Sequence, residues 1–294
     1  MVTVVGAAIA LAVVGGGAAL AARPVRALNL LAAIGSHRTA SGVRYGADDR
    51  QRFDLYQPAQ RGSTAPFPLV LFVYGGSWNR GERGDYRFVG EALAARGIAA
   101  MVIDYRLYPS VSYPAFLQDT AQGVAYALAH ASSWGADPHR VFVMGHSAGG
   151  YNAAMIALDP RWLAATGHQP SQLAGWIGLA GPYDFLPIHD PDVKPVFHAP
   201  DVAQDTQPIV HARVAVQPLP AFLAAPRTDP LVDPDRSTSQ LARVLRERGA
   251  VVVEHRYDRV DHATLCGAMA WPLTRLAPVR DDVVRFVAET PPAR

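Results

Sequence analysis

Short, unbroken apolar runs alternate with longer, alanine-rich segments along most of this 294-residue chain. The runs are rich in Val, Ile and Leu and lie between Pro and Gly residues, which is typical of strands buried on both faces of a sheet. The segments between the runs carry apolar residues at helical spacing, and several of them end at a glycine. This alternation predicts a fold of the α/β class: a mostly parallel central sheet with helices on both faces.

The expected elements follow this rhythm to the carboxyl terminus. Strands are expected at 52–56, 68–74, 98–105, 140–144, 175–179, 219–225 and 250–255. Helices are expected at 86–96, 114–130, 150–158, 237–248 and 281–289. The stretch 182–220 interrupts the rhythm, because it is rich in Pro, Asp and His and has little periodicity. We therefore expect one domain over residues 45–294, with a small cap insertion at about 182–220.

The amino terminus has the composition of a membrane or export element. Residues 2–22 carry no charged side chain, and a helix at about 1.5 Å per residue would span roughly the 30 Å core of a bilayer there. The small-x-small pattern at 19–21 favours a cleaved signal peptide, whereas the length of the stretch and the lack of Lys or Arg before it favour an uncleaved anchor. If the stretch is uncleaved, Arg23 and Arg26 favour a cytoplasmic carboxyl side. A buried helix of a soluble protein is the third interpretation. We expect residues 2–22 to be a signal peptide or membrane anchor and residues 23–44 to be a connecting segment. The protein is then expected in the cell envelope, and the side of the membrane is left open.

Composition excludes several classes of function. The 27 Lys and Arg residues against 25 Asp and Glu give a net charge of +2, and no basic run forms the stripe that nucleic-acid binding usually needs. A single cysteine, Cys266, excludes an intrachain disulfide, a CxxC pair and a cysteine zinc site. The acidic pairs 48–49 and 281–282 have no His or Glu at ligand spacing, so neither a metal nor a cofactor is expected.

The strongest local motif is a G-x-S-x-G sequence at 145–149, between an expected strand and an expected helix. A strand-to-helix turn of this kind is so tight that only glycine fits at its flanks, and it exposes the serine hydroxyl above the edge of the sheet. The amino terminus of the following helix adds a favourable dipole. Ser147 is therefore the predicted nucleophile.

A serine hydroxyl needs an imidazole to take its proton and a carboxylate to orient that imidazole. Asp229 and His262 each follow one of the last two expected strands, which gives the chain order Ser, Asp, His. Asp229 is the leading acid, with Asp233 as the alternative. His262 is the leading base, since structural roles are expected for His146 beside the nucleophile and for His255 within a strand.

An acyl-transfer site also needs amide hydrogens for the developing oxyanion. The glycine-rich sequence 74–78 (YGGSW) follows an early expected strand, at the position where such donors are usually found. We assign Gly76 and Ala148 as the main donors of an oxyanion hole, with Gly75 or Ser77 as a third.

Together these motifs resemble the α/β-hydrolase superfamily, in particular its carboxylesterase branch with HGG-x-W oxyanion loops. That branch includes hormone-sensitive-lipase-like, feruloyl-esterase-like and kynurenine-formamidase-like enzymes. The matching segments are 74–78, 104–109 (DYRLYP), 134–155, 178–187, 228–232 (TDPLV) and 261–262. Two departures are visible. Tyr74 replaces the histidine that usually precedes the two glycines, and residues 224–227 (AAPR) precede the acid where relatives often carry His-Gly.

The resemblance implies a serine hydrolase that cleaves a carboxylic ester through an acyl-enzyme. A small or medium uncharged substrate is favoured, because no Arg or Lys cluster near the motifs suggests an anionic one. An arylformamidase with the same triad and a non-catalytic, membrane-tethered binding module are the alternatives. The oligomeric state is left open. Aromatic and apolar residues expected to bind substrate, or else to pack in the core, are Trp78, Tyr151, Tyr183 and Phe185, followed by Leu186 and Phe197.

Overall fold

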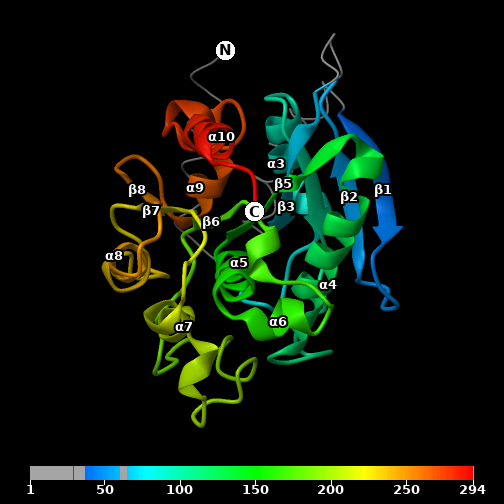
Figure 1. Cartoon of the computed structure of the whole chain (residues 1–294). Helices are drawn as coiled ribbons and strands as arrows, with labels where there is room; N and C mark the ends of the chain where they lie inside the picture. The colour runs from blue at the N-terminus through cyan, green and yellow to red at the C-terminus, as the bar shows by residue number, and fades with distance from the viewer. Residues whose placement is uncertain (1–28, 30–36, 60–64, 294) are drawn as a thin grey trace.

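The structure, a computed structural model, describes residue 29 and residues 37–59 and 65–293. Within these residues one eight-stranded sheet has the order β1-β2-β4-β3-β5-β6-β7-β8 (Figure 1). The strands β1 and β2 pair antiparallel, as do β2 and β4, and all other neighbours pair parallel. The strands are β1 Arg38–Arg44, β2 Arg52–Tyr56, β3 Phe67–Val73, β4 Ala99–Ile103, β5 Ala136–His146, β6 Gly175–Leu179, β7 Ala221–Pro226 and β8 Val252–Tyr257. The expected α/β class is thus confirmed.

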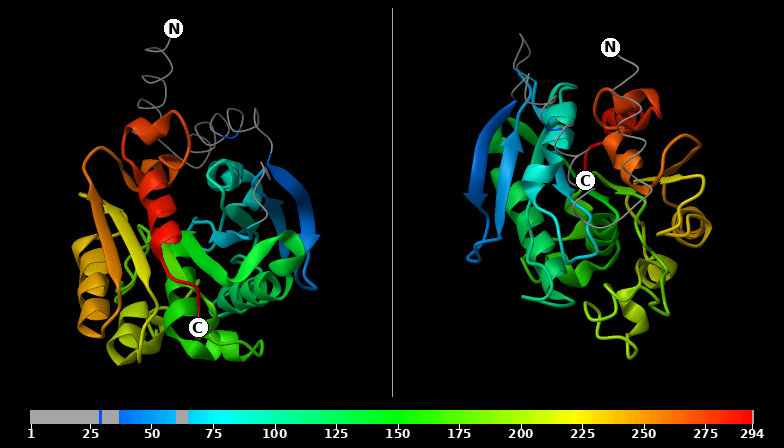
Figure 2. Two further views of the ribbon diagram at one scale, coloured as in Figure 1. Left: turned by 45° about the horizontal axis from the view of Figure 1, so that its top comes forward. Right: turned by 180° about the vertical axis from the view of Figure 1, so that it is seen from behind.

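Helices cover both faces of the sheet (Figures 1 and 2). The α-helices are α3 Arg87–Ala94, α4 Ala115–His130, α5 Ala148–Leu158, α6 Pro160–Ala164, α7 Pro208–Val214, α8 Gln240–Glu247, α9 His262–Gly267 and α10 Val279–Glu289. On one face α10 lies beside α3, and Phe286 of α10 packs on Phe142 and Phe222 of the sheet. On the other face α4 approaches closely, because Gly123 sits against Leu71 and Ile103.

The sheet begins earlier than expected. Strand β1 lies in the stretch 23–44 that was expected to be a connecting segment, and it pairs with β2 at the edge of the sheet. Its sequence, RTASGVR, lacks the apolar alternation of a half-buried strand, and its residues are exposed or half-buried. The domain boundary at residue 45 is therefore wrong, since residues 38–44 belong to the sheet.

The expected cap insertion runs from the end of β6 to the start of β7. Apart from the short helix η4 Gln204–Thr206 and α7, it is irregular. It follows the carboxyl end of a parallel strand, the edge where ligands bind in sheets of this kind.

The expected signal peptide or anchor at 2–22 lies outside the described residues, so it stays a prediction. In the part of the chain that the structure describes, no helix is both long and apolar enough to cross a membrane.

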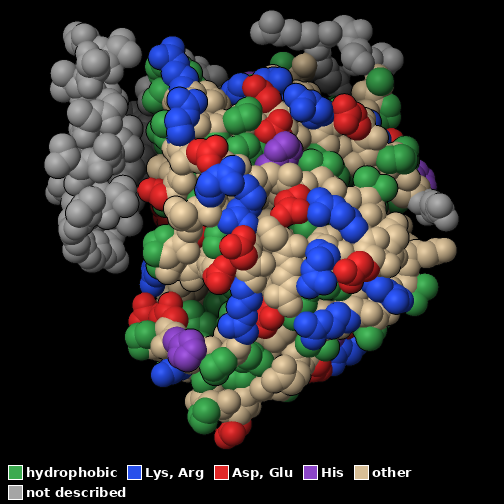
Figure 3. Space-filling model, turned by 90° about the vertical axis from the view of Figure 1, so that its left-hand side faces the viewer, with side chains coloured by type: hydrophobic (Ala, Val, Ile, Leu, Met, Phe, Trp, Pro, Cys, Tyr) green, Lys and Arg blue, Asp and Glu red, His purple; other side chains and the backbone are tan. Residues whose placement is uncertain are grey.

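The edge formed by β8 and α8 carries charges of both signs close together (Figure 3). Arg246 pairs with Glu254 at 2.8 Å, and Arg256 pairs with Asp235 at 2.8 Å. Such exposed pairs add little stability, but charged side chains discourage unwanted pairing at an open sheet edge.

Candidate active site

Ser147 lies in a sharp turn between β5 and α5. Its backbone has φ 53° and ψ −121°, a conformation that side-chain-bearing residues rarely adopt. A Cβ atom on Gly145 would lie 2.0 Å from the carbonyl oxygen of Gly149, and one on Gly149 would lie 2.0 Å from that of Val73. The turn therefore requires glycine at both flanks.

This packing predicts that Gly149→Ala destabilises the fold severely. Because the added methyl group meets backbone rather than a movable side chain, we expect the free energy of unfolding to fall by more than about 3 kcal/mol. Urea denaturation followed by circular dichroism measures this. Gly84→Ala is the control, since its Cβ would meet nothing closer than 3.6 Å. A Gly149→Ala variant as stable as Gly84→Ala would contradict the packing described.

The structure brings Ser147, His262 and Asp229 together in that order. Oγ of Ser147 lies 2.8 Å from Nε2 of His262, and Nδ1 of His262 lies 2.6 Å from Oδ2 of Asp229. The His262 side chain is 12% exposed and that of Asp229 is fully buried. Because a carboxylate only accepts hydrogen bonds, Nδ1 carries the hydrogen and Nε2 presents its lone pair to the serine.

Asp229 is held as a carboxylate. Burial alone would raise the pKa of Asp229. The hydrogen bond from His262, the electrostatic attraction of its ring and the hydrogen bonds from the backbone amides of Leu231 and Val232 outweigh burial, so this pKa lies below its ordinary value. The two amides donate to Oδ1 at 2.9 and 3.2 Å, which leaves Oδ2 for His262. The acid is therefore oriented as well as ionised.

The other carboxylates near the site have structural partners. Asp233, the alternative acid, accepts hydrogen bonds from the amides of Asp235 and Arg236 at 2.9 and 3.1 Å. Asp261, the residue before His262, is the N-cap of α9 and accepts from the amides of Ala263 and Thr264. Neither carboxylate orients the imidazole of His262.

His146 and His255, for which structural roles were expected, also have structural contacts. Nε2 of His146 lies 2.8 Å from the carbonyl oxygen of His262, so it must carry the hydrogen and donate it. Burial, and then the nearby His262, lowers the pKa of His146 to about 3, so this ring is neutral at ordinary pH. His255 lies in β8 and stacks on Tyr257.

The glycine-rich loop after β3 lies against the serine. A Cβ on Gly75 would be 2.8 Å from Cβ of Ser147, so glycine there gives the two segments room. Gly76, Ser77 and Trp78 have φ values of 128°, 50° and 57°, which turn the backbone sharply. Among the described residues, no acceptor takes the amide hydrogens of Gly76, Ser77 or Ala148. These amides are therefore available to an oxyanion, and Ser77 and Ala148 line the same cavity as Ser147.

A cavity of about 420 Å³ opens in front of Ser147 and His262. Part of its wall is apolar and is formed by Trp78, Phe185, Ile188, Val193, Leu231 and neighbouring prolines. Its rim carries charged and imidazole groups: Arg80, Asp184, His189, Asp190, Asp233 and Arg236. Most of the lining thus comes from the cap, the glycine-rich loop and the loop that carries Asp229.

Trp78 and Phe185 line this cavity, as expected for substrate-binding residues. The candidates that do not line it are Tyr151, Tyr183, Leu186 and Phe197. Tyr151 is fully buried and its hydroxyl donates to a backbone carbonyl of the cap, while the ring of Tyr183 lies over Gly178 of β6. The substrate-binding role expected for Tyr151 and Tyr183 is therefore wrong, because both rings fill the core beneath the cap.

Sequence reasoning missed two ion pairs that join the cap to the rest of the site. Arg236 pairs with Asp184 at 3.0 Å, and Arg80 pairs with Asp192 at 3.4 Å. The irregular composition of the cap marks its residues as candidates for the cavity wall. The partners are far apart in the chain, so no local pattern indicates the pairing.

Comparison with known proteins identifies the family. A model of the BD-FAE family matches residues 53–245, well over half of the chain. The chain belongs to the BD-FAE family. The resemblance to the carboxylesterase branch of the α/β-hydrolase superfamily is thereby confirmed, and the matched region holds Ser147 and Asp229 but ends before His262.

Two curated relatives come from a plant and from a bacterium. A rice protein (Oryza sativa subsp. japonica) named "Probable isoprenylcysteine alpha-carbonyl methylesterase" is 30% identical over 249 residues, which cover 78% of this chain and 58% of the relative. "Probable carboxylic ester hydrolase LipM" of Mycobacterium tuberculosis is 27% identical over 235 residues, covering 74% and 54%. The chain thus spans little more than half the length of these relatives.

Solved structures share the fold. Esterase 2 of Thermogutta terrifontis has a TM-score of 0.68 at 20% identity, with 85% of this chain and 95% of that one covered. A truncated carbohydrate esterase from gut microbiota has a TM-score of 0.67 at 17% identity, with 87% and 97% covered.

Proposed function

We propose that this protein is a serine hydrolase that cleaves a carboxylic ester through an acyl-enzyme. The observation that carries the proposal is the aligned array of Ser147, His262 and Asp229, with distances of 2.8 and 2.6 Å, at the base of an open cavity. The names of the curated relatives, a methylesterase and a carboxylic ester hydrolase, support the same reaction class.

The arrangement of these residues supports each step of acyl transfer. Nε2 of His262 takes the proton of Ser147 as Oγ attacks the ester carbonyl, and the ionised Asp229 stabilises the imidazolium that forms. The amides of Gly76 and Ala148, with Ser77 as a third donor, bind the oxyanion. His262 then protonates the leaving alcohol. In deacylation His262 takes a proton from the attacking water, the bond between the acyl carbon and Oγ of Ser147 breaks, and His262 returns the proton to Oγ as the carboxylic acid leaves.

The cavity supports a small or medium uncharged ester. Its volume of about 420 Å³ lies toward the lower end of the roughly 300–1,000 Å³ typical of ligand pockets. The two arginines on its rim, Arg80 and Arg236, are each paired with a cap aspartate, so neither offers an unpaired cation to an anionic substrate.

A panel of substrates tests this proposal. The full chain and its Ser147→Ala variant are assayed on p-nitrophenyl esters from acetate to palmitate and on one arylformamide. We expect serine-dependent hydrolysis that is fastest for short acyl chains. Faster turnover of the formamide than of every ester would favour the arylformamidase alternative. Failure to hydrolyse any compound would favour the non-catalytic binding module.

The pH dependence should have a simple acidic limb. Asp229 keeps its charge and His146 stays neutral above pH about 5, because the pKa of Asp229 is lowered and that of His146 is about 3. Neither Asp229 nor His146 therefore changes its charge above about pH 5. We expect the acidic limb of log kcat/KM to have a limiting slope no steeper than one above about pH 5. A limiting slope of two would show that a second group must also be deprotonated.

A further inference from the structure

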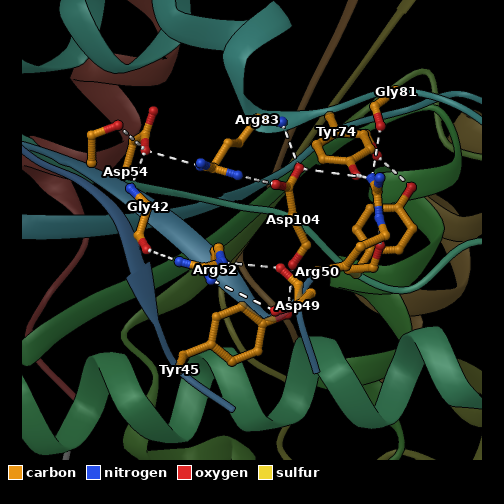
Figure 4. A network of polar contacts seen from close by, with 12 residues as sticks. Gly42, Tyr45, Asp49, Arg50, Arg52, Asp54, Tyr74, Gly81, Arg83 and Asp104 are labelled. Atoms are coloured by element: carbon orange, nitrogen blue, oxygen red, sulfur yellow. Dashed lines mark hydrogen bonds and ion pairs between the residues drawn. The ribbon is translucent and has the colours of Figure 1, made fainter. Parts of the chain in front are cut away.

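Arg50 joins the two ends of the glycine-rich loop, residues 74–83, which we call the oxyanion loop (Figure 4). One guanidinium nitrogen, Nη2, donates to the phenol oxygen of Tyr74 at 2.6 Å and to the carbonyl oxygen of Gly81 at 2.8 Å. Nε of the same side chain donates to the carbonyl oxygen of Tyr105 at 2.9 Å. The planar guanidinium of Arg50 therefore connects three points: Tyr74 at the start of the loop, Gly81 near its end, and Tyr105 after β4.

The contacts of Tyr74 make this connection stiff. The ring is fully buried and stacks between those of Tyr105 and Tyr86, with centroids 4.7 and 5.6 Å away. The hydroxyl of Tyr105 donates to the backbone carbonyl of Tyr74 at 3.0 Å. Gly81 packs against the Tyr74 ring, since a Cβ there would lie 2.9 Å from Cδ2 and Cε2 of that ring. Both the side chain and the backbone of Tyr74 are therefore held.

Buried carboxylates hold the far end of the loop. Asp104 accepts from the backbone amide of Arg83 at 2.7 Å and also bonds its guanidinium. Asp54 accepts from Nε of Arg83 at 2.9 Å. Asp104 also lies 3.8 Å from Nη2 of Arg50, so its charge favours the position that Arg50 occupies.

In the same loop the amide hydrogens of Gly76 and Ser77 have no acceptor among the described residues. The carbonyl of Tyr74 accepts from Tyr105, and that of Gly76 accepts from the amides of Asn79 and Arg80 at 3.0 and 3.1 Å. A carbonyl shares a rigid peptide plane with the amide of the next residue, so these bonds fix the directions of the amide hydrogens of Gly75 and Ser77.

We propose that Arg50, acting through Tyr74 and Gly81, is a positioning residue for the oxyanion hole. The inference rests on the proposed function. It explains how the loop is held where Tyr74 stands in place of histidine: a guanidinium bridges the phenol to the other end of the loop. An oxyanion hole contributes only when its donors are already in place, and a displacement of about 1 Å can cost roughly 10²-fold in rate.

The test compares Arg50→Met and Tyr74→Phe with Arg52→Met. Arg52 is the matched control, because its side chain is 33% exposed against 37% for Arg50 and it donates to the carbonyls of Asp49 and Gly42, away from the loop. For Arg50→Met we expect kcat to fall about 10- to 100-fold with KM changed by less than about 3-fold. Tyr74→Phe, which keeps the ring, should show a smaller loss of the same kind, and Arg52→Met should behave as wild type.

A second readout separates positioning from general damage. Oγ of Ser147 adds to the carbonyl carbon of a trifluoromethyl ketone, the carbonyl oxygen becomes negatively charged, and His262 takes the serine proton. The inhibition constant of such a ketone therefore reports the oxyanion hole. We expect that constant to rise by the same factor by which kcat/KM falls, in Arg50→Met and in Tyr74→Phe. If Arg50→Met does not fold, Tyr74→Phe decides.

Three results would overturn the proposal. In the first, kcat and the inhibition constant stay at the wild-type level in Arg50→Met and in Tyr74→Phe. In the second, Arg52→Met shows the same losses, which indicates loss of stability alone. In the third, the wild type lacks Ser147-dependent turnover, which removes the proposed function itself. The first two leave wild-type turnover intact, so the two failures are distinguishable.

Discussion

Replacing Ser147 by alanine is expected to lower kcat for ester hydrolysis by at least about 10³-fold. The hydroxyl supplies the attacking oxygen, and no other hydroxyl in the described residues forms a hydrogen bond with the imidazole of His262. What remains is binding and oxyanion stabilisation, which act only on the slow attack of water. The measurement is initial-rate kinetics on the best ester of the panel, with substrate binding checked separately.

Ser237→Ala is the matched control. Ser237 also lines the cavity, but its hydroxyl accepts from the backbone amide of Tyr183 at 3.3 Å and does not contact the imidazole. We expect its kcat to stay within about 3-fold of the wild type. A Ser147→Ala variant that keeps most of its activity would sink the proposed mechanism.

Asp229→Asn is expected to lower kcat by about 10³- to 10⁴-fold with little change in KM. The amide at position 229 can donate to Nδ1 of His262, which favours the tautomer whose Nε2 carries a hydrogen and cannot accept the serine proton. It also removes the negative charge that stabilises the imidazolium. Steady-state kinetics give both constants.

The comparison variant is Asp233→Asn, which tests the alternative acid. The side-chain oxygen of asparagine can accept the same two backbone hydrogen bonds that Asp233 accepts, so kcat should change by less than about 3-fold. Equal losses in Asp229→Asn and Asp233→Asn would mean that the acid is misassigned.

The arrangement of the triad could be predicted because each member follows a regular strand. The runs that form β5, β7 and β8 are recognisable, and in a parallel sheet their carboxyl ends meet at one edge. Chain order and this edge were therefore enough to place Ser147, Asp229 and His262 together.

The features that sequence missed depend on tertiary packing. Aromatic rings suit a core as well as a cavity, so composition could not separate the cavity residue Phe185 from the core residue Tyr183. Strand β1 is an edge strand without an apolar face, and its pairing with β2 is what defines it. The bond from Arg50 to Tyr74 joins residues 24 positions apart, and no local pattern marks it.

The most direct test of the central claim, that Ser147 is an activated nucleophile, is covalent labelling with an alkyl p-nitrophenyl phosphonate. Intact-mass and peptide mass spectrometry of the full chain should show one adduct, on Ser147, with release of one equivalent of p-nitrophenol. The adduct should be absent from Ser147→Ala and should form much more slowly in Asp229→Asn. An unlabelled wild type, or an adduct on any other residue, would contradict the account.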